Sequence, residues 1–530
     1  MNRWVGFGLL LLLAPATSPQ EVKLPDVFTE VIDVRVVNIE VVVTDADGIR
    51  VHGLGPGDFR LRVDGAPRPI EYFSEILGGE SVGDSGALPG APALAEGAST
   101  SYLVFIDDYF SIARDRNRVL GALIEDLDRL HARDRMAVVA FDGRGLELLS
   151  SWTQSRLELE RALRHATERK SYGLHRMGEL RASDRSGFGF RRGIGRLDPL
   201  ERSYARRLAE QVERAVSAVV ATLRSFASPP GRKVMILLNG GWPAAPAEFA
   251  VTTSRGSFGA AYAASRELIP RSATLLSPLA DAANLLGYTL YPVDVPGMGS
   301  GFASDGGTGS GLMGREGQMH DSLSFLARET GGQPLYNSRR LSALETVSDD
   351  TRSYYWLGFS LDRAGDDSRH DVEVDVLRPG LEVRTREGFV DLSRRSEVTM
   401  VVESSLLFGH PASDRPLEVR FGKARKARRG IVEIPLEVGF ALDDVTLLQV
   451  GPDAYGGEVE VRVTVMDESG YRSDTPVESV RIAGRERPEP GQMYWWKTTL
   501  LMRKRNHRVV VAVFDALSGA MFSSSAEIFP

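Results

Sequence analysis

The sequence predicts a multidomain protein, with a central α/β domain built on a doubly wound sheet, a small N-terminal all-β domain and a C-terminal β-sandwich-like domain. The chain has 530 residues, which is more than one hydrophobic core usually holds. Between residues 101 and 345, short apolar runs alternate with helical patterns, as in a parallel sheet covered by helices. Before and after that segment, the patterns are those of strands joined by turns.

The composition excludes several classes of site. Hydrophobic residues make up 42% and charged residues 25% of the chain, which is ordinary for globular domains. The formal net charge is −7, and a weakly acidic chain lacks the surplus basic charge that non-specific nucleic-acid binding needs. No nucleic-acid partner is therefore expected. The absence of cysteine excludes disulfides, thiolate zinc sites, iron–sulfur clusters and cysteine nucleophiles.

The first segment, residues 1–16, has the pattern of a signal peptide. Arg3 supplies a positive charge, residues 4–13 form a short apolar run, and Ala14 and Ala16 make a small-x-small pair, which predicts cleavage near Ala16. The apolar run is shorter than the roughly 20 residues of a membrane-spanning helix, and no other run reaches that length. We expect no transmembrane segment and an extracytoplasmic protein, periplasmic or secreted; an uncleaved N-terminal anchor is the alternative.

A small all-β domain is predicted over residues 25–77. Residues 31–43 alternate apolar and polar side chains and are rich in β-branched residues, and residues 59–63 form a second such pattern before an Asp-Gly turn signal. Residues 78–100 are rich in Gly, Ala, Ser and Pro and contain no aromatic residue. This composition predicts a flexible linker.

The central α/β domain is predicted over residues 101–345. Its apolar runs are continuous, as in strands that are buried on both faces. The predicted strands are residues 102–106, 136–141, 233–238 and 288–293, and the predicted helices are residues 112–131, 157–165, 205–226, 275–286 and 321–330. In such sheets, ligands bind beyond the carboxyl ends of the strands.

Helical patterns stop after residue 353. Residues 346–395 are predicted to form short strands appended to the α/β domain, and residues 396–530 a separate all-β domain. The second prediction rests on strand patterns over residues 459–465 and 509–514, with turn signals between them. About 135 residues of short strands favour a sandwich.

Several segments form a set typical of one family. Inside the α/β domain these are YLVFID, which ends at Asp107, then RMAVVAF, SWT at residues 151–153 opening the next helix, and KVMILLNGG. Outside it, they are residues 42–70 (VVTDADGIRVHGLGPGDFRLRVDGAPRPI), 353–360 (SYYWLGFS) and 378–390 (RPGLEVRTREGFV). This set resembles the acidobacterial type of protein that carries a von Willebrand factor type A (vWA) domain. The resemblance implies a vWA/Rossmann-like central fold and an exported, non-enzymatic, protein-binding architecture.

The resemblance also implies a metal-ion-dependent adhesion site, in which an Asp, two Ser, a Thr and a second Asp hold Mg²⁺. Asp107 and Ser111 match the first and last positions of its Asp-x-Ser-x-Ser motif, but Tyr109 occupies the middle one. Asn239 replaces the second Asp, and residues 170–204 contain no Thr. Mg²⁺ prefers six oxygens and dehydrates reluctantly. We therefore predict a degenerate site in which Asp107 and Asn239 bond backbone groups; Mg²⁺ binding by Asp107, Ser111 and Asn239 is the alternative.

Three further segments have simpler interpretations. Residues 170–200 hold seven Lys/Arg against three Asp/Glu, which predicts a solvated, partly disordered insertion or, alternatively, a grip on an acidic partner. The run ARKARR at residues 424–429 is interpreted as a solvated turn. The GDSG motif at residues 83–86 resembles a protease nucleophile motif, but it lies in the predicted linker, where no rigid scaffold would fix a triad.

No combination of acid, base and nucleophile emerges, so no enzymatic activity, catalytic residue or cofactor is predicted. We interpret the chain as an exported binding protein whose vWA-like domain contacts a protein partner. The alternatives are a Mg²⁺-dependent adhesin that uses Asp107 and Ser111, a hydrolytic enzyme that uses Asp107 and Asp108, and a structural envelope protein. The sequence identifies neither the partner nor the oligomeric state.

Overall fold

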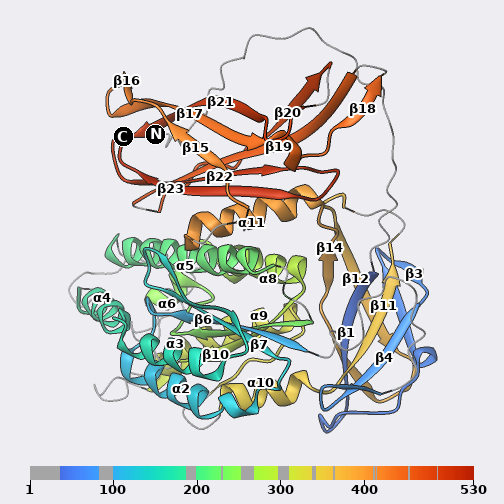
Figure 1. Ribbon diagram of the computed structural model, residues 1–530. Helices are drawn as coiled ribbons and strands as arrows, with labels where there is room; N and C mark the ends of the chain where they lie inside the picture. Colours follow the sequence, from blue (N-terminus) through green and yellow to red (C-terminus); the bar gives the residue numbers. More distant parts are fainter. Residues whose placement is uncertain are drawn as a thin grey trace. The chain divides into compact units, whose positions relative to one another are not determined.

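The chain divides into two compact units, residues 33–393 and residues 394–530 together with 1–32. The computed structural model describes residues 36–82, 99–186, 199–227, 229, 231–251, 268–295, 309–336, 342–361, 365–409, 412–413, 415–451, 454–468, 470–485 and 488–530. The predicted signal peptide and most of the predicted linker lie outside these residues. The multidomain, β-rich architecture with additional helices is confirmed (Figure 1).

A five-stranded sheet forms the centre of the first unit, in the order β10-β9-β6-β7-β8. Its strands are β6 (Thr100–Asp107), β7 (Arg135–Phe141), β8 (Leu146–Thr153), β9 (Arg232–Asn239) and β10 (Tyr288–Asp294). β10, β9, β6 and β7 are parallel, and β8 is an antiparallel edge strand. Every residue of β6 is buried, because the central strand of a parallel sheet is covered on both faces.

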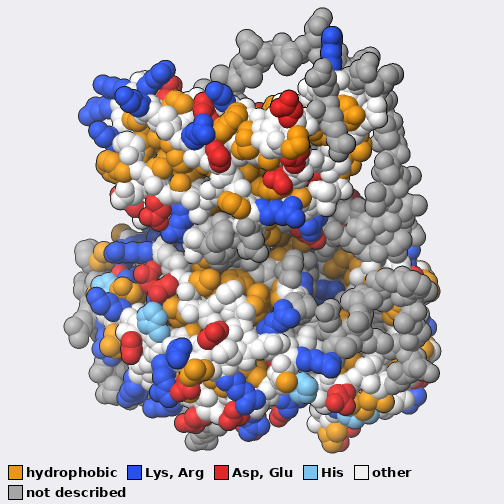
Figure 2. Space-filling view, in the orientation of Figure 1, with side chains coloured by type: hydrophobic (Ala, Val, Ile, Leu, Met, Phe, Trp, Pro, Cys, Tyr) orange, Lys and Arg blue, Asp and Glu red, His pale blue; other side chains and the backbone are white. Residues whose placement is uncertain are grey.

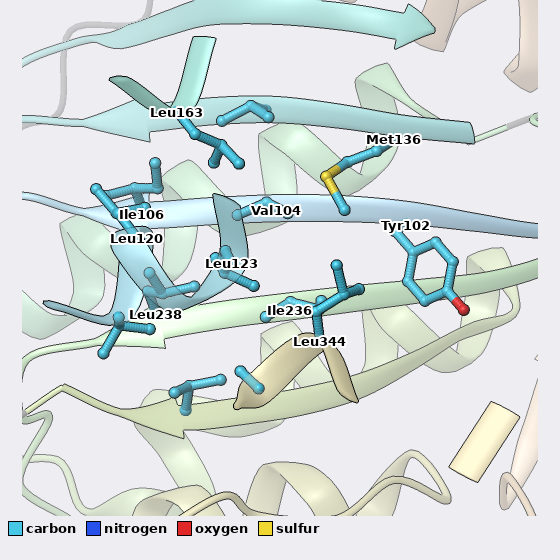
Figure 3. Close-up of a cluster of buried hydrophobic side chains, with 14 of the residues drawn as sticks. Tyr102, Val104, Ile106, Leu120, Leu123, Met136, Leu163, Ile236, Leu238 and Leu344 are labelled. Carbon is cyan, nitrogen blue, oxygen red and sulfur yellow. The ribbon is translucent and has the colours of Figure 1, made fainter. Parts of the chain in front are cut away.

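Helices cover both faces of this sheet (Figure 1). They are α2 (Ala113–Glu125), α3 (Arg156–Glu168), α4 (Gly173–Ser186), α5 (Pro199–Ser225), α6 (Pro246–Val251), α8 (Ser272–Leu286), α9 (Gly309–Glu329) and α10 (Ala343–Thr351), with the short 3-10 turn η2 (Leu127–Arg129). On one face, alternate side chains of β6, Val104 and Ile106, belong to the same core as Leu120 of α2, Leu163 of α3 and Leu344 of α10 (Figure 3). This alternation follows from the two-residue period of a strand.

The segment around residues 151–153 differs from the expectation that it opens a helix. These residues end the edge strand β8, which pairs with β7. Helix α3 starts only after Ser155, whose side chain accepts a hydrogen bond from the backbone N–H of Glu158. A serine in that position stabilises the first turn of a helix, so the helix begins at its cap and leaves the preceding residues extended.

Two distant parts of the chain build one β domain in the first unit. The first part contributes β1 (Val36–Asp45), the 3-10 turn η1 (Pro56–Asp58), β2 (Phe59–Val63), β3 (Ala66–Arg68), β4 (Tyr72–Leu77) and β5 (Glu80–Val82). The second contributes β11 (Tyr354–Ser360), β12 (Arg369–Val376), β13 (Leu381–Arg384) and β14 (Gly388–Val390). They form two sheets, in the orders β13-β1-β11-β4-β5 and β14-β12-β2-β3.

The structure therefore differs from the expected domain boundaries of 25–77 and 346–395. The later strands do not extend the α/β sheet but complete the N-terminal β domain. The physical reason is a shared core, in which Ile39, Val41 and Leu61 pack with Leu357 and Phe359. Neither set of strands could bury its apolar face alone.

A buried charge cluster joins this β domain to the α/β domain. The carboxylate of Asp350, at the end of α10, accepts hydrogen bonds from Arg50 and from Tyr291 of β10, and from Arg384 at 2.6 and 2.8 Å. Gln333 donates a further bond at 3.2 Å. Burial by itself would raise the pKa of Asp350, but the two guanidinium groups hold it below its ordinary value.

The second unit contains one helix and two sheets among its described residues. Its elements are α11 (Arg394–Phe408), β15 (Glu418–Phe421), β16 (Arg425–Arg428), β17 (Ile431–Ala441), the 3-10 turn η4 (Leu442–Asp444), β18 (Leu448–Gly451), β19 (Ala454–Asp467), β20 (Val477–Gly484), β21 (Met493–Arg503), β22 (His507–Phe514) and β23 (Met521–Ile528). β15, β16 and β21 pair with β17, while β18, β20 and β22 pair with β19, and β23 continues beyond β22. Side chains from both sheets share one core, as in a sandwich.

Helix α11 corrects the expectation that residues 396–530 are all-β. Val398, Val402 and Leu406 are four residues apart and buried, which is the spacing of one helix face. Val402 and Leu406 pack on Val510 and Ala512 of β22. Within the described residues of both units, no helix has the length and apolar character to cross a membrane.

We predict that Asp350→Ala destabilises the first unit by about 3–5 kcal/mol, because it leaves two guanidinium groups without their buried carboxylate. The control is Asp281→Ala, since Asp281 also pairs with an arginine of the β domain, Arg369, but is 56% exposed. Exposed pairs contribute about 0–1 kcal/mol. Denaturant unfolding of the two variants checks this, and an equally small loss in both would contradict a stabilising role for the cluster.

Candidate functional site

The candidate site lies at the carboxyl edge of the parallel sheet. Asp107 ends β6, Asn239 ends β9 and Asp294 ends β10. Asn239 lies beside Asp294 in the sheet register, and the residue before Asp107 lies beside the residue before Asn239. The structure thus brings together the strand ends that the sequence singled out.

N–H donors occupy both carboxylate oxygens of Asp107. Oδ1 accepts hydrogen bonds from the backbone N–H groups of Tyr109 at 3.0 Å and Phe110 at 3.2 Å. Oδ2 accepts one from the indole Nε1–H of Trp242 at 2.8 Å. Asp107 and Trp242 are both fully buried, so the indole takes the oxygen that the neighbouring backbone leaves free.

Asn239 shapes the turn that leads to Trp242. Its Oδ1 accepts a hydrogen bond from the backbone N–H of Gly241 at 2.7 Å, while its Nδ2 is buried and has no hydrogen-bond partner in the described part of the chain. The predicted backbone bonds of Asp107 and Asn239 are therefore present. Sequence reasoning missed Trp242, although it directly follows the quoted segment KVMILLNGG.

Tyr109, the middle residue of the predicted Asp-x-Ser-x-Ser segment, is held by ring packing and by a hydrogen bond. Its ring packs against Phe110, with ring centroids 5.1 Å apart, and its hydroxyl accepts a hydrogen bond from Arg176 Nη1 at 2.9 Å. The Arg176 guanidinium also lies 4.6 Å from the centroid of this ring, a cation–π distance. On the other side lies Gly143, where a Cβ would come within 2.1 Å of the Tyr109 ring. The position of the Tyr109 ring therefore requires a residue without a side chain at position 143.

Helix α4 brings Arg176 to the site and corrects the interpretation of residues 170–200. Residues 173–186 are helical, and residues 187–198 lie outside the described part. The backbone N–H of Tyr172 donates to the carbonyl of Asp108 at 2.8 Å, and that of Gly173 to the carbonyl of Ser111 at 2.9 Å. The start of the segment is therefore bonded to the loop after β6 instead of being solvated.

Ser111 lies in the same loop but bonds nothing through its side chain. The Oγ atom is buried and has no hydrogen-bond partner among the described residues. The backbone N–H of Ser111 donates to the carbonyl of Asp107 at 3.2 Å. Of the three predicted metal ligands Asp107, Ser111 and Asn239, Ser111 is thus the one whose side-chain oxygen accepts no hydrogen bond from a described residue.

Asp108 is neutralised by two arginines. Its carboxylate accepts hydrogen bonds from Arg116 Nη1 at 2.5 Å and from Arg169 Nε at 2.7 Å. Asp108 and Arg116 are both fully buried, and Arg169 contacts Glu147 as well. Burial raises the pKa of Asp108 although both arginines pull it down. Asp108 is therefore tied up in an ion-pair cluster.

Burial raises the pKa of the Asp107 carboxyl to about 7. The cost of removing its negative charge from water exceeds the effect of the Trp242 indole and the Phe110 amide, which favour the charged form, and the Asp108 carboxylate raises the pKa further. Shifted carboxyl groups are frequent at functional sites, but packed interiors produce them too.

The residues present do not fit a Mg²⁺ ion. Octahedral Mg²⁺ needs several oxygen ligands with free lone pairs, whereas three of the roughly four acceptor positions of the Asp107 carboxylate already accept hydrogen bonds. The Tyr109 ring occupies the second hydroxyl position. In the described part of the chain, no three His, Asp or Glu side chains are grouped as a metal site.

The arrangement also lacks the features of a hydrolytic site. Asp107, Asp108 and Ser111 are each 0% exposed. No histidine is within hydrogen-bond distance of the Ser111 Oγ, which has no partner among the described residues. A general base must reach the proton that it abstracts, and these side chains are instead packed in the protein interior.

No family model and no curated protein matches this chain. Among solved structures, it is similar to a Bacteroides uniformis β-glucuronidase 2 covalently bound to cyclophellitol-6-carboxylate aziridine, with 12% identity and a TM-score of 0.15 over 22% of this chain and 13% of that chain. A second structure of a Bacteroides uniformis β-glucuronidase has 11% identity and a TM-score of 0.15 over 33% of this chain and 19% of that one.

The pilus adhesin SpaC from Lactobacillus rhamnosus GG has 8% identity and a TM-score of 0.24, over 81% of this chain and 56% of that chain. All three TM-scores are too low to indicate a shared fold. These similarities therefore carry no argument about function.

We predict that Asp107→Asn changes how stability depends on pH. With a folded pKa of about 7 and an unfolded pKa of about 3.9, the folded carboxyl keeps its proton between these values while the unfolded one loses it. Asp107 therefore lowers the free energy of unfolding as pH rises from about 4 to 7, and asparagine does not titrate.

The free energy of unfolding of Asp107→Asn minus that of the wild type should increase by about 1.4 kcal/mol per pH unit over this range and stay constant above it. Denaturant unfolding at a series of pH values measures this difference. A difference that does not change with pH would show that Asp107 is already ionised in the folded protein.

Proposed function

We propose that this chain is an exported, non-enzymatic binding protein whose α/β domain is vWA-like and contacts a protein partner without a metal ion. The mostly parallel sheet with helices on both faces supports the vWA-like part of the proposal, because the resemblance implies an α/β domain of this general kind. The motifs quoted outside the α/β domain cover parts of β1 to β3, β11, β13 and β14, which belong to the β domain joined to it.

The contacts of Asp107 carry the metal-independent part of the proposal. Three N–H donors supply part of the electrostatic compensation that a cation would otherwise give to this buried carboxyl group, and its raised pKa favours the neutral form, which needs no cation. Tyr109 and Asn239 also disfavour a metal ion. The Tyr109 ring occupies space beside Asp107, and Asn239 positions the turn that leads to Trp242. Partner binding would then use the protein surface around the carboxyl edge.

Leu174 marks that surface. It belongs to the first turn of α4, next to the segment bonded to Ser111, and its side chain is 66% exposed. Single exposed apolar residues are common on protein surfaces, so Leu174 serves as a probe of the surface beside the carboxyl edge. The adhesin that holds Mg²⁺ through Asp107 and Ser111 remains the second candidate, because the Ser111 Oγ is unbonded in the described structure. No contact among the described residues specifically supports an enzyme or a structural envelope protein.

Metal titration by calorimetry separates the two candidates. We predict no tight Mg²⁺ or Mn²⁺ binding by the full chain. Tyr109→Ser/Asn239→Asp should raise the affinity only partly, because the Trp242 indole still occupies Oδ2 of Asp107, and adding Trp242→Phe should raise it further. Tight binding by the wild type that Asp107→Ala abolishes would overturn the proposal in favour of the adhesin.

Affinity capture from an envelope extract tests partner binding. We predict that the captured protein is retained in the presence of a chelator and is reduced about tenfold by Leu174→Ser. The matched control is Leu157→Ser in α3, which changes another leucine that is 57% exposed. Leu157 follows the end of β8, and that end pairs with the start of β7. It therefore lies at the amino edge of the sheet, opposite the carboxyl edge. Equal capture by both variants would place the binding surface elsewhere.

A further inference from the structure

One end of the second unit gathers basic and aromatic side chains from separate hairpins. Ile431 lies opposite Arg503 in the β17–β21 register, so the turn before β17 lies beside the turn after β21. The register Asp467–His507 brings the turn after β19 to the same end, and His507–Ile528 brings the end of β23 there. We call this end, with strand β16, the basic tip.

Six basic side chains of the basic tip form no ion pair with any described residue, although Arg425 lies opposite Glu433 in the β16–β17 register. These are Lys423, Arg425, Lys426, Arg428, Arg429 and Lys504. All six are exposed, and none of them forms an ion pair within the described part of the chain. Figure 2 shows blue side chains gathered where Figure 1 labels β16. Elsewhere in the same unit, exposed basic residues such as Lys497 and Arg481 do have acidic partners.

Protection of a sheet edge explains only part of this charge. β16 pairs with β17 alone, and lysine or arginine on an edge strand discourages pairing with another chain. Arg429 and Lys504, however, lie in turns, where no strand edge needs protection. The concentration of unpaired charge at the tip therefore calls for a partner that is itself anionic.

Exposed aromatic side chains lie beside these charges. Tyr471, in the turn after β19, is 70% exposed, and its ring centroid lies 6.0 Å from the guanidinium of Arg503. Phe529 is 67% exposed and lines the same depression as Asn506. The carboxylates of Asp467, Glu468 and Glu527 also line it, so the depression itself is not the anion-binding part of the tip. Aromatic rings beside lysine and arginine suit the headgroup region of a bilayer, where rings enter the interface and basic groups meet anionic lipids.

We propose that the basic tip binds the surface of a bilayer that contains anionic phospholipids. Five of the six charges lie on residues 423–429, on β16 and its flanking residues, and Lys504 adds a sixth from the turn after β21. The exposed rings of Tyr471 and Phe529 lie at the same end, and this combination of charges and rings suits a bilayer surface better than a single bound peptide. An acidic peptide added as a further strand is also disfavoured, because the register of β16 is irregular between Lys426 and Arg428 and interrupts the edge that such a strand would use.

Sedimentation of the full chain with vesicles tests this proposal. We expect binding to phosphatidylcholine vesicles that contain phosphatidylglycerol, little binding to pure phosphatidylcholine, and weakening by added salt. Arg428→Gln/Arg429→Gln should reduce the partition coefficient about 30-fold, from the contribution of each basic residue near an anionic surface. Tyr471→Ser should reduce it by a smaller factor that salt does not change.

The control is Arg481→Gln/Lys497→Gln, which removes two positive charges from the same unit outside the basic tip. Both side chains are exposed and pair with Glu458 and Glu437, so this variant should bind vesicles like the wild type. Equal binding to both kinds of vesicle, or equal losses in the two double variants, would overturn the proposal. Binding to polyglutamate or heparin without binding to vesicles would assign the basic tip to a soluble polyanion instead.

Discussion

The antiparallel pairing of β1 with β11 determines the arrangement of the first unit. Val36–Val41 pair with Tyr355–Ser360, so the chain must return to the β domain after it has completed the α/β sheet. The α/β domain is consequently an insertion within one β domain and is held at both ends. Asp350 reinforces this closure, because its carboxylate bonds Arg50 from the first half of the β domain, Arg384 from the second half, and Tyr291 from the α/β sheet.

At the carboxyl edge of the parallel sheet, as in the Asp350 cluster, buried carboxylates are surrounded by hydrogen-bond donors and arginines. Parallel strands deliver their polar ends to one edge, and two adjacent carboxylates, Asp107 and Asp108, are buried there. A buried charge needs partners of opposite polarity. Asp107 obtains them from N–H donors and Asp108 from Arg116 and Arg169. These partners offset the cost of burial only in part, since the pKa values of both carboxyl groups are still raised.

The two proposed surfaces use different physical interactions. At the carboxyl edge the charges are satisfied internally, and the exposed feature is an apolar side chain, Leu174. At the basic tip the charges are unsatisfied and face solvent. A net charge of −7 gives no indication of this local surplus, because summing over the whole chain averages the tip with the acidic residues elsewhere. Five of the six charges come from the single run at residues 423–429, and the fold adds Lys504 beside them.

The sequence by itself determined the buried strands of the parallel sheet and the residues that end them, but not α4, α11 or the edge strand at residues 151–153. Continuous apolar runs such as 102–106 suit only strands buried on both faces, and Asp107 and Asn239 follow such runs directly. The tertiary structure decided what lies against them. The pairing of β1 with β11, the indole of Trp242 on Asp107, and the packing of Arg176 on Tyr109 all join residues far apart in the chain. Periodicity describes how a segment orients its own side chains, whereas such contacts depend on how separate segments pack, which no local pattern encodes.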